Sequence, residues 1–411
     1  MGEIIELLKF PSSALLAVAF LVIAFAVHYY ARDKRLVRVL GSAQTGMVLL
    51  GIGAVLLAIE GVWAVPVHRS GAFVAYLLVL LLSLSFAILK GFKRKACPGF
   101  MLNHVGLFII VWASLFGAPD VSRSKVVIGK EVPVNTAYSP DGLTVSLPFE
   151  VCLDEFTIDY YPDGKSPRQF TSRINVDGER LETSVNHPCS YRGYTFFQDS
   201  YDREAGRYSV LLLVRAPWLS VVYLGMTMLA VGAVLLLFGR WKAKITIPLT
   251  LVLTVAFTFL TVAKINFGTL MPALRSWWFV PHLFIYMVAY ALMALALLLI
   301  IVRMIKGRQR SDEGEDVPGN LVRSSSALLI IGMLTGSVWA HQAWGDYWAW
   351  DPKENWAAAT WFIALMYFHM KDRRGWKALV LVAVAFLALQ ITWYGVNVLP
   401  SAAKSMHTYM Q

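Results

Sequence analysis

Ten long runs of mostly apolar residues constrain this chain of 411 residues more than any other feature. A helical run of about 18–20 apolar residues is long enough to cross the hydrocarbon core of a bilayer. Hydrophobic residues make up 57% of the sequence and charged residues 15%, whereas about a quarter of the residues in a soluble domain are charged. We therefore expect an all-α polytopic membrane protein with about ten transmembrane helices and one β-rich domain. The expected helices cover residues 12–30, 44–62, 72–89, 101–118, 218–238, 245–263, 280–302, 325–340, 355–370 and 378–397.

A polar stretch of about one hundred residues separates the fourth run from the fifth. This stretch is too long for a bare loop, so we expect it to fold by itself. Apolar and polar residues alternate in segments 143–147 and 194–198, and Pro-Asp-Gly turns lie at 140–142 and 162–164. This pattern predicts short antiparallel strands, so residues 119–217 are expected to form an extracytoplasmic β-rich domain.

The short loops between the runs predict the orientation of the chain in the membrane. One alternating set of loops holds 20 Lys and Arg residues and the other set holds 6. Because cytoplasmic loops carry the excess of positive charge, both termini and the β-rich domain are expected on the outer side. The net charge of +11 is therefore a topology signal and does not indicate a nucleic-acid partner. The first run is expected to be retained rather than cleaved as a signal peptide.

A dense tryptophan stretch at residues 339–356 joins the eighth and ninth runs on the outer side. It contains five tryptophans and one tyrosine, together with Gly345 and Asp-Pro-Lys-Glu. Aromatic residues also gather at membrane interfaces, but such a belt needs one or two anchors for each helix end. A large, flat, apolar ligand with a polar edge needs stacking faces, close backbone approach and a few charges. The stretch is therefore interpreted as a binding site for such a ligand rather than as an aromatic belt.

Histidines lie at two levels of the predicted topology. His282 and His407 fall on the outer side, whereas His104 and His369 lie at similar depth near the cytoplasmic side. Ionisable groups near the membrane are costly and usually functional, and two imidazoles from different helices can ligate haem iron from opposite faces. His28 is an alternative to His104 at the inner level.

Other residues leave alternatives open. His341 is a spare candidate ligand inside the tryptophan stretch. Cys152 and Cys189 fall in the extracytoplasmic domain, where they either form a disulfide or remain free thiols. The chain contains three cysteines and no Cys-x-x-Cys pair, which argues against a thiol oxidoreductase or a zinc site. Asp351, Lys353 and Glu354 bond either haem propionates or each other, and Lys353 suits a propionate better than the two acids do. No nucleophile–base pair stands at a recognisable spacing.

The tryptophan stretch resembles the WWD motif of haem-handling membrane proteins, which in words is Trp-Gly-x-x-Trp-x-Trp-Asp. Its candidate haem-binding residues here are Trp344, Gly345, Trp348, Trp350, Asp351, Lys353 and Glu354. The Pro-Lys-Glu that follows is typical of the CcsA (ResC) branch. Segments 270–282 and 405–409 resemble the regions of that branch's two external histidines, and His369 falls where the branch has a transmembrane histidine.

The N-terminal half resembles a compact CcsB (ResB) protein, through segments 103–107 and 186–198. Nearly the whole chain thus resembles a fused CcsBA-type System II cytochrome c synthase. The resemblance implies a CcsB-like membrane region, a β-rich domain, a fifth helix that closes the CcsB-like half, and a CcsA-like haem-handling domain. These parts cover residues 1–118, 119–217, 218–240 and 241–411 respectively.

The resemblance also implies a function and its partners. Haem b, the substrate, passes from an inner site at His104 and His369 to an outer site at His282 and His407. There the Cys-x-x-Cys-His segment of an apocytochrome c is attached through thioethers, by positioning of the reactants rather than by acid–base catalysis. The expected location is the bacterial inner membrane, and a thioredoxin-like thiol reductase is a further expected partner. Two alternatives remain: a haem exporter that serves a separate ligase and, less favoured because an open tryptophan loop suits release, a haem-bearing electron carrier.

Overall fold

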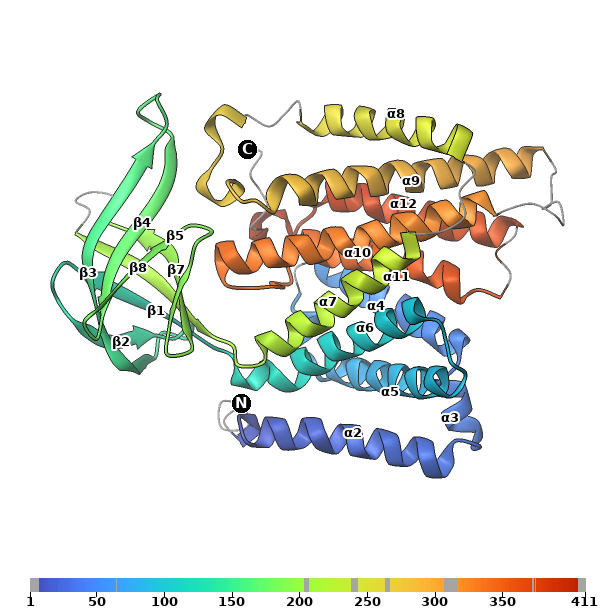
Figure 1. Cartoon of the computed structure of the whole chain (residues 1–411), viewed down its shortest axis with the longest axis horizontal. Helices are drawn as coiled ribbons and strands as arrows, with labels where there is room; N and C mark the ends of the chain where they lie inside the picture. The colour runs from blue at the N-terminus through green and yellow to red at the C-terminus, as the bar shows by residue number, and fades with distance from the viewer. Residues whose placement is uncertain are drawn as a thin grey trace.

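The computed structural model describes residues 7–63, 65–202, 207–237, 243–262, 267–306, 316–371, 373 and 375–405. Figure 1 shows two parts, a bundle of long helices and a β-rich domain at one end of the bundle. The predicted fold class, a polytopic helical membrane protein with one β-rich domain, is confirmed.

Each of the ten expected apolar runs corresponds to a helix, although some runs, such as 378–397, extend past the end of the helix. The long helices are α2 (Ser12–Ala31), α4 (Ala43–Trp63), α5 (Gly71–Lys93), α6 (Pro98–Gly117), α7 (Leu219–Leu237), α8 (Ala243–Val262), α9 (Phe279–Ile305), α10 (Val317–Trp344), α11 (Pro352–His369) and α12 (Gly375–Trp393), and a short helix α3 (Arg35–Leu40) follows α2. Within the described ranges, eight helices are long and apolar enough to cross a membrane, and the chain is a multi-span membrane protein. In α8 the part whose side chains are described, Pro248–Phe259, is an apolar helix, and α11 has 18 residues.

Helix α10 begins before its expected apolar run, because residues 317–324 include the polar Asn320, Arg323 and Ser324, and the serines that follow are buried as well. Ser325 donates its hydroxyl proton to the carbonyl of Ala289 on α9 at 2.8 Å, and Ser326 donates to the carbonyl of Val322 at 2.8 Å. Buried hydroxyls that bond backbone carbonyls are compatible with a helix inside a membrane bundle. The hydropathy of residues 317–324 therefore understates the length of this helix.

The two halves of the chain interleave in the bundle. Helix α4 packs against α11, α6 packs against α7, and α7 packs against α10. The approach of α6 to α7 is close, since a Cβ added at Gly106 would lie 2.8 Å from the carbonyl oxygen of Gly225. Small residues commonly allow such contact between membrane helices. The largest apolar cluster lies among α9, α10, α11 and α12, with Met287, Met293 and Leu389 nearly inaccessible to solvent.

The β-rich domain is one eight-stranded antiparallel sheet in the order β5-β4-β3-β2-β1-β8-β7-β6. The edge strand β5 approaches β6 and β7 at the opposite end of the sheet, and the hydroxyl of Thr183 on β5 donates to the carbonyl of Phe196 on β7 at 2.8 Å. The sheet therefore closes into a barrel-like shape around an apolar interior that includes Ile128, Val151 and Leu211. The strands are β1 (Ser122–Gly129), β2 (Val134–Tyr138), β3 (Thr144–Tyr160), β4 (Pro167–Val176), β5 (Glu179–Ser184), β6 (Cys189–Tyr191), β7 (Tyr194–Tyr201) and β8 (Tyr208–Arg215).

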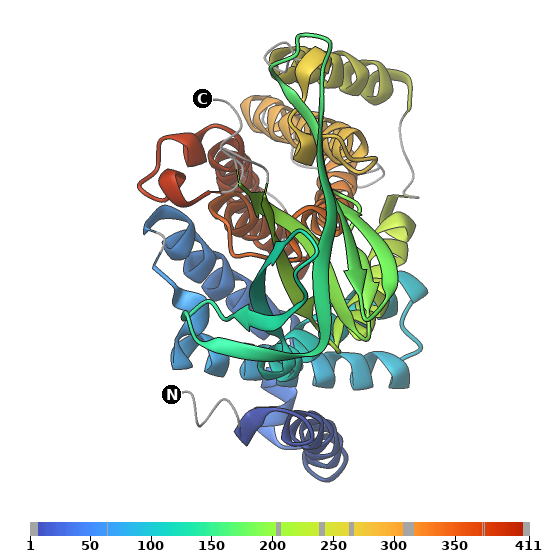
Figure 2. The same cartoon turned by 90° about the vertical axis from the view of Figure 1, so that its left-hand side faces the viewer.

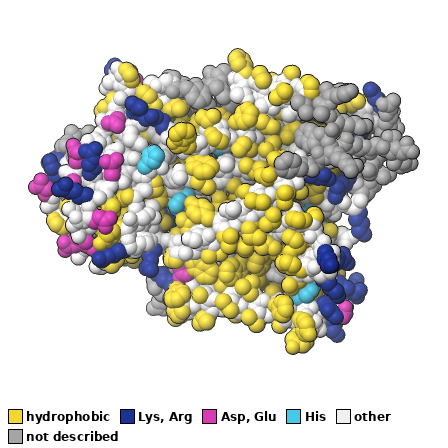
Figure 3. All heavy atoms as spheres, in the orientation of Figure 1, with side chains coloured by type: hydrophobic (Ala, Val, Ile, Leu, Met, Phe, Trp, Pro, Cys, Tyr) yellow, Lys and Arg dark blue, Asp and Glu magenta, His cyan; other side chains and the backbone are white. Residues whose placement is uncertain are grey.

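The β-rich domain lies over the end of the bundle, as Figure 2 shows. The segment that leads into α9 forms part of the contact. The Tyr161 hydroxyl donates to the carbonyl of Leu270 at 3.0 Å, and the Asn186 side-chain amide donates to that of Pro272 at 2.8 Å. In Figure 3 hydrophobic side chains cover the bundle, both signs of charge gather on the β-rich domain, and Lys and Arg lie near the opposite end.

Candidate functional site

Gly345 sets the geometry at the start of the tryptophan motif. It ends α10 with a φ of 79°, and its N–H donates to the carbonyl of His341 at 2.9 Å. A left-handed glycine is a common helix end. An added Cβ would lie 3.0 Å from Val214 Cγ2 and 3.1 Å from Phe197 Cε2, both in the β-rich domain. The turn and the domain contact therefore explain this glycine, for which the sequence suggested the approach of a flat ligand.

The loop that follows Gly345 is held between the β-rich domain and the bundle. Arg123 of β1 forms an ion pair with Asp346. The hydroxyls of Tyr347 and Ser114 of α6 are hydrogen-bonded at 2.8 Å, and burial raises the pKa of the Tyr347 hydroxyl. None of residues 339–356 is exposed. The expectation of an open loop is therefore wrong, because contacts from a domain distant in sequence cover the motif.

Trp350 adopts a backbone conformation that is unusual for a bulky residue. Its φ of 59° lies in the left-handed region, where a non-glycine residue costs about 1–3 kcal/mol unless its surroundings compensate. The Asn355 side-chain amide donates to the carbonyl of Trp350 at 3.0 Å, and the N–H groups of Ala349 and Asp351 donate to Glu354 Oε2 at 2.8 and 3.1 Å. These bonds hold the indole ring in place.

The two acids at the end of the motif form the N-terminal cap of α11. Asp351, which is 4% exposed, accepts a hydrogen bond from the backbone N–H of Lys353 at 2.8 Å. Glu354 returns the bond to the backbone of Asp351, so the pair makes a capping box. Of the two alternatives for the acids, the structure therefore favours shaping of the loop over contact with a propionate. Lys353 is half-buried beside them.

A cavity of about 710 Å³ lies beneath the loop and is lined mainly by apolar side chains. This volume is within the usual range for small-molecule sites, about 300–1,000 Å³. Trp348, Trp350 and Trp361 contribute aromatic walls, and His68 and His341 also line the cavity. The ring of His341 packs edge-on against Phe197 of β7, with ring centroids 5.8 Å apart.

His68 and Glu60 form a pair that the sequence did not indicate. Nδ1–H of His68 donates to Glu60 Oε1 at 2.5 Å, and the His68 ring stacks on Trp350 with centroids 4.6 Å apart. Glu60 lies near the end of α4 and is 5% exposed. A buried carboxylate in an otherwise apolar run was the signal that could have pointed to the pair.

His282 lies on the other side of the motif, in the first turn of α9. Its Nδ1 bonds the carbonyl of Gly332 at 2.8 Å, which puts the lone pair of the neutral ring on Nε2. Its ring centroid lies 5.9 Å from that of Trp339, and Trp339 packs against Trp344. The expected partner His407 lies outside the described residues. The motif thus contributes Trp339 and Trp344 to one side, and Trp348 and Trp350 to the other.

His104 and His369 lie near each other at the opposite end of the bundle, within range of electrostatic interaction. Each ring bonds through Nδ1 the carbonyl four residues earlier, Phe100 or Leu365, at 2.9 Å. The neutral rings therefore both carry their lone pairs on Nε2. The alternative, His28, lies against Phe86 of α5 with ring centroids 5.8 Å apart, and its charged neighbours are Arg32 and Lys93.

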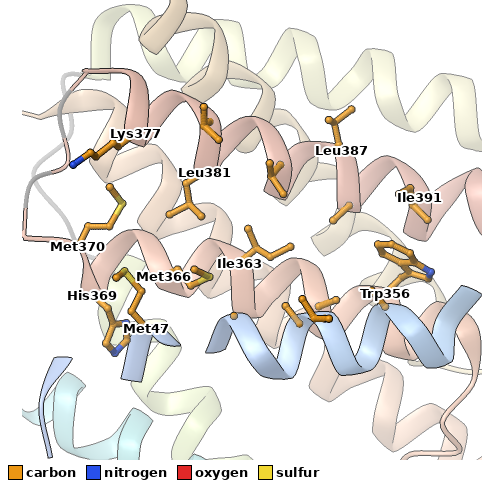
Figure 4. Close-up of a pocket in the computed structure, with 18 of the residues that line it drawn as sticks. Met47, Trp356, Ile363, Met366, His369, Met370, Lys377, Leu381, Leu387 and Ile391 are labelled. Atoms are coloured by element: carbon orange, nitrogen blue, oxygen red, sulfur yellow. The ribbon is translucent and has the colours of Figure 1, made fainter. Parts of the chain in front are cut away.

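A second cavity, of about 880 Å³, lies among α4, α11 and α12 and includes His369. Figure 4 shows His369 and Met47 at one end of it and Trp356 at the other. His369 and Trp356 are thirteen positions apart, which corresponds to about 20 Å along a helix. This cavity therefore extends along α11 from the inner histidine toward the tryptophan motif.

The cysteines of the β-rich domain are free thiols in the structure. Cys152 lies on β3 and Cys189 on β6, and burial raises the pKa of Cys189 to about 11. Of the two alternatives left by the sequence, the structure favours the unpaired thiols. Among the described residues no three His, Cys, Asp or Glu side chains are grouped so that they could hold a metal ion.

Comparison with known proteins matches both halves of the chain. Residues 217–403 match the family model of the cytochrome c assembly protein, and residues 86–213 match that of the ResB-like family. The cytochrome c biogenesis protein CcsA of Chlamydomonas reinhardtii is 31% identical over 189 residues, 42% of this chain and 52% of that protein. CcsA of Porphyra purpurea is 30% identical over 224 residues, 42% of this chain and 69% of that protein.

CcsA of Gloeobacter violaceus is 46% identical over 85 residues, which are 20% of this chain and 24% of that protein. The chain therefore spans about half the length of the first of these relatives and more than two thirds of the second. The chain belongs to the CcsA family of cytochrome c biogenesis proteins and carries a ResB-like region in the same polypeptide, as a fused CcsBA-type protein does.

Proposed function

We propose that this protein acts in cytochrome c biogenesis, by bringing haem to the outer face of the membrane and attaching it to apocytochrome c. The attachment is a pair of thioethers between the haem vinyl groups and the cysteines of a Cys-x-x-Cys-His segment. The observation that carries the proposal is the position of the tryptophan motif, which is held between the β-rich domain and the bundle. In that position its indoles form walls beside His282 on one side and along a cavity of about 710 Å³ on the other.

The outer site is proposed to hold haem b through His282 and His407. Tryptophan faces suit the macrocycle, and an imidazole with its lone pair on Nε2 suits the iron. A backbone carbonyl at Nδ1, as at His282, is a common outer contact of a ligating histidine, because it fixes the ring. Lys353 is the proposed propionate partner, since Asp351 and Glu354 bond the backbone of the loop.

The inner site is proposed to receive haem between His104 and His369. Both rings are fixed through Nδ1 in the same way as His282. The cavity along α11 supports a route outward, because it has an apolar lining and extends toward the motif. Haem is apolar over its faces, so such a lining lowers the cost of moving it through the bilayer.

The reaction depends mainly on positioning of the thiol and the vinyl group. A thiol adds across a vinyl group without net oxidation, provided that the sulfur and the vinyl carbon are held close together. The histidine of the Cys-x-x-Cys-His segment then replaces one protein ligand at the iron, which releases the product. The apocytochrome is proposed to dock beside the β-rich domain, and a thioredoxin-like reductase is proposed to keep its cysteines reduced.

The proposed location is the bacterial cytoplasmic membrane, with both termini and the β-rich domain on the outer side. The excess of Lys and Arg in one set of loops supports this orientation. The basic side chains near the end of the bundle opposite the β-rich domain agree with it (Figure 3).

The test is expression in a host that lacks cytochrome c maturation, with a reporter apocytochrome. Wild type should co-purify with bis-histidine haem and give a reporter with covalent haem. His282→Ala and His407→Ala should reduce the amount of reporter with covalent haem at least tenfold. His104→Ala and His369→Ala should reduce the amount of haem bound at both the inner and the outer site. His187→Ala, on the surface of the β-rich domain, is the matched control. Haem-loaded protein without covalent reporter would favour the exporter alternative, and normal maturation by all four variants would refute the site.

A further inference from the structure

The cavity beneath the tryptophan loop contains a histidine–carboxylate pair that the scheme above does not use. His68 lies in the short helix η1 (Val67–Arg69), between α4 and α5. Its ring donates Nδ1–H to Glu60 Oε1 at 2.5 Å, and its backbone N–H donates to Oε2 of the same carboxylate at 3.0 Å. The buried carboxylate therefore fixes both the loop and the imidazole.

Stacking on Trp350 also fixes the orientation of the His68 ring. The two rings are 4.6 Å apart and 4° from parallel. Because the Nδ1–H of His68 is hydrogen-bonded to Glu60, the neutral ring carries its lone pair on Nε2. His68 lines the cavity. A carboxylate at Nδ1 is found both behind metal-ligating histidines and behind histidines that act as general bases.

The stacking geometry favours the general base. The lone pair of an imidazole lies in the plane of its ring, which here is nearly parallel to the plane of Trp350. A macrocycle that lies parallel to this tryptophan is therefore parallel to the His68 lone pair. Such a nitrogen is directed along the macrocycle and toward groups at its edge, rather than at the iron. The vinyl groups and the cysteines that attack them are at that edge.

From this geometry we infer that Nε2 of His68 takes the proton from a cysteine thiol of the apocytochrome during thioether formation. The inference rests on the proposed function. The S–H bond breaks as its proton moves to Nε2, and the imidazolium delivers that proton to the β-carbon of the vinyl group, where the π-electron pair forms the new C–H bond. The sulfur bonds to the α-carbon, so that a thiol and an alkene become a thioether without any oxidant. Glu60 stabilises the imidazolium while it exists.

Other ionisable groups near His68 have contacts of their own. Glu60 of α4 bonds His68, and Tyr76 of α5, which lines the same cavity, donates its hydroxyl proton to the carbonyl of Leu49 at 3.2 Å. Elsewhere along the same cavity, Arg123 is paired with Asp346, Tyr347 bonds Ser114, and His341 packs on Phe197 and Tyr223. Among the described groups, the geometry therefore assigns proton transfer to His68.

The experiment measures the rate of covalent haem attachment from pH 6.5 to pH 9, with purified haem-loaded protein and a reduced apocytochrome. The variants are His68→Gln, which can still donate to Glu60, and Glu60→Gln. At pH 7 a general base contributes about 10²–10⁴-fold, so His68→Gln should attach haem at least tenfold more slowly. Its remaining rate should follow the free thiolate, with a pKa of about 8.5, and rise about 25-fold between pH 7 and pH 9. Glu60→Gln should show a smaller loss of the same kind.

The haem absorption spectrum is the second readout, and His187→Gln is the control. An unchanged haem content and spectrum in His68→Gln, with slower and more strongly pH-dependent attachment, supports the inference. Loss of haem from this variant makes His68 a haem-holding residue and overturns the inference. A variant with the wild-type rate and pH profile overturns it as well. If wild type attaches no haem at any pH, the proposed function itself fails, which is a distinct result.

Discussion

Replacement of Gly345 by alanine tests whether the motif is shaped by its backbone. Glycine stands there at a φ of 79°, and an L-residue in this region costs about 1–2 kcal/mol. The added methyl group would also lie 3.0 Å from Val214 and 3.1 Å from Phe197, where overpacking costs about 1–3 kcal/mol. Because Val214 can move by a few tenths of an ångström, we take the lower part of that range. Gly345→Ala should therefore weaken the docking of the β-rich domain by about 2–4 kcal/mol.

Hydrogen exchange of the Gly345 amide, which bonds the carbonyl of His341, reports this change directly. A loss of about 2–4 kcal/mol accelerates exchange about 30-fold to 1,000-fold, since every 1.4 kcal/mol is a factor of ten. Val214→Ala removes the nearest methyl group, so the double variant should recover about 1 kcal/mol of the loss. The reasoning is refuted if Gly345→Ala leaves exchange unchanged but abolishes haem binding, because the glycine would then serve the ligand.

Three further predictions concern other parts of the site. Arg123→Ala leaves the half-buried Asp346 without its ion pair, so it should destabilise the contact between the domains by about 1–3 kcal/mol, seen as faster hydrogen exchange in the loop. Asp351→Ala removes the cap of α11 and should cost about 1–2 kcal/mol, measured as faster exchange in the first turn of that helix. The pKa of Cys189 is raised to about 11 by burial, so about 0.1% of it is thiolate at pH 8. Maleimide should label the exposed Cys97 much faster, and labelling of Cys189 should rise about tenfold per pH unit until pH 11; equal rates at pH 8 would contradict the burial.

The helices could be predicted from the sequence because a bilayer requires only length and low polarity. The start of α10 was missed for the same reason, since residues 317–324 include Asn320, Arg323 and the buried Ser324, which lower the hydropathy of that segment. The alternating pattern likewise predicted strands in the β-rich domain. It could not predict which strands are neighbours, because β1 pairs with β8, whose residues lie about 90 positions later in the chain.

The site was predictable only in part, for the same reason. The tryptophans, His282 and the inner histidines stand out in the sequence, because their side chains are rare at such positions. Arg123 and Asp346 are separated by 223 residues, and no local pattern connects them. His68 and Glu60 are eight residues apart, but their place in the site depends on Trp350 from the other half of the chain, on which the ring of His68 stacks. Contacts between the two halves of the chain thus carry the information that the sequence lacks.

The arrangement of the motif implies that its residues act for different physical reasons, although loss of any of them is expected to stop maturation. Gly345 and the capping acids fix the path of the backbone, and they hold Trp350 in a conformation that it would not adopt alone. That conformation places the indole against His68, so a change in the cap reaches the cavity through one strained residue. A variant of Asp351 should therefore alter both loop exchange and attachment, whereas His68→Gln should alter attachment alone. Measuring both hydrogen exchange in the loop and the rate of haem attachment therefore distinguishes residues that support the backbone from residues that take part in the reaction. The yield of matured cytochrome alone does not distinguish them.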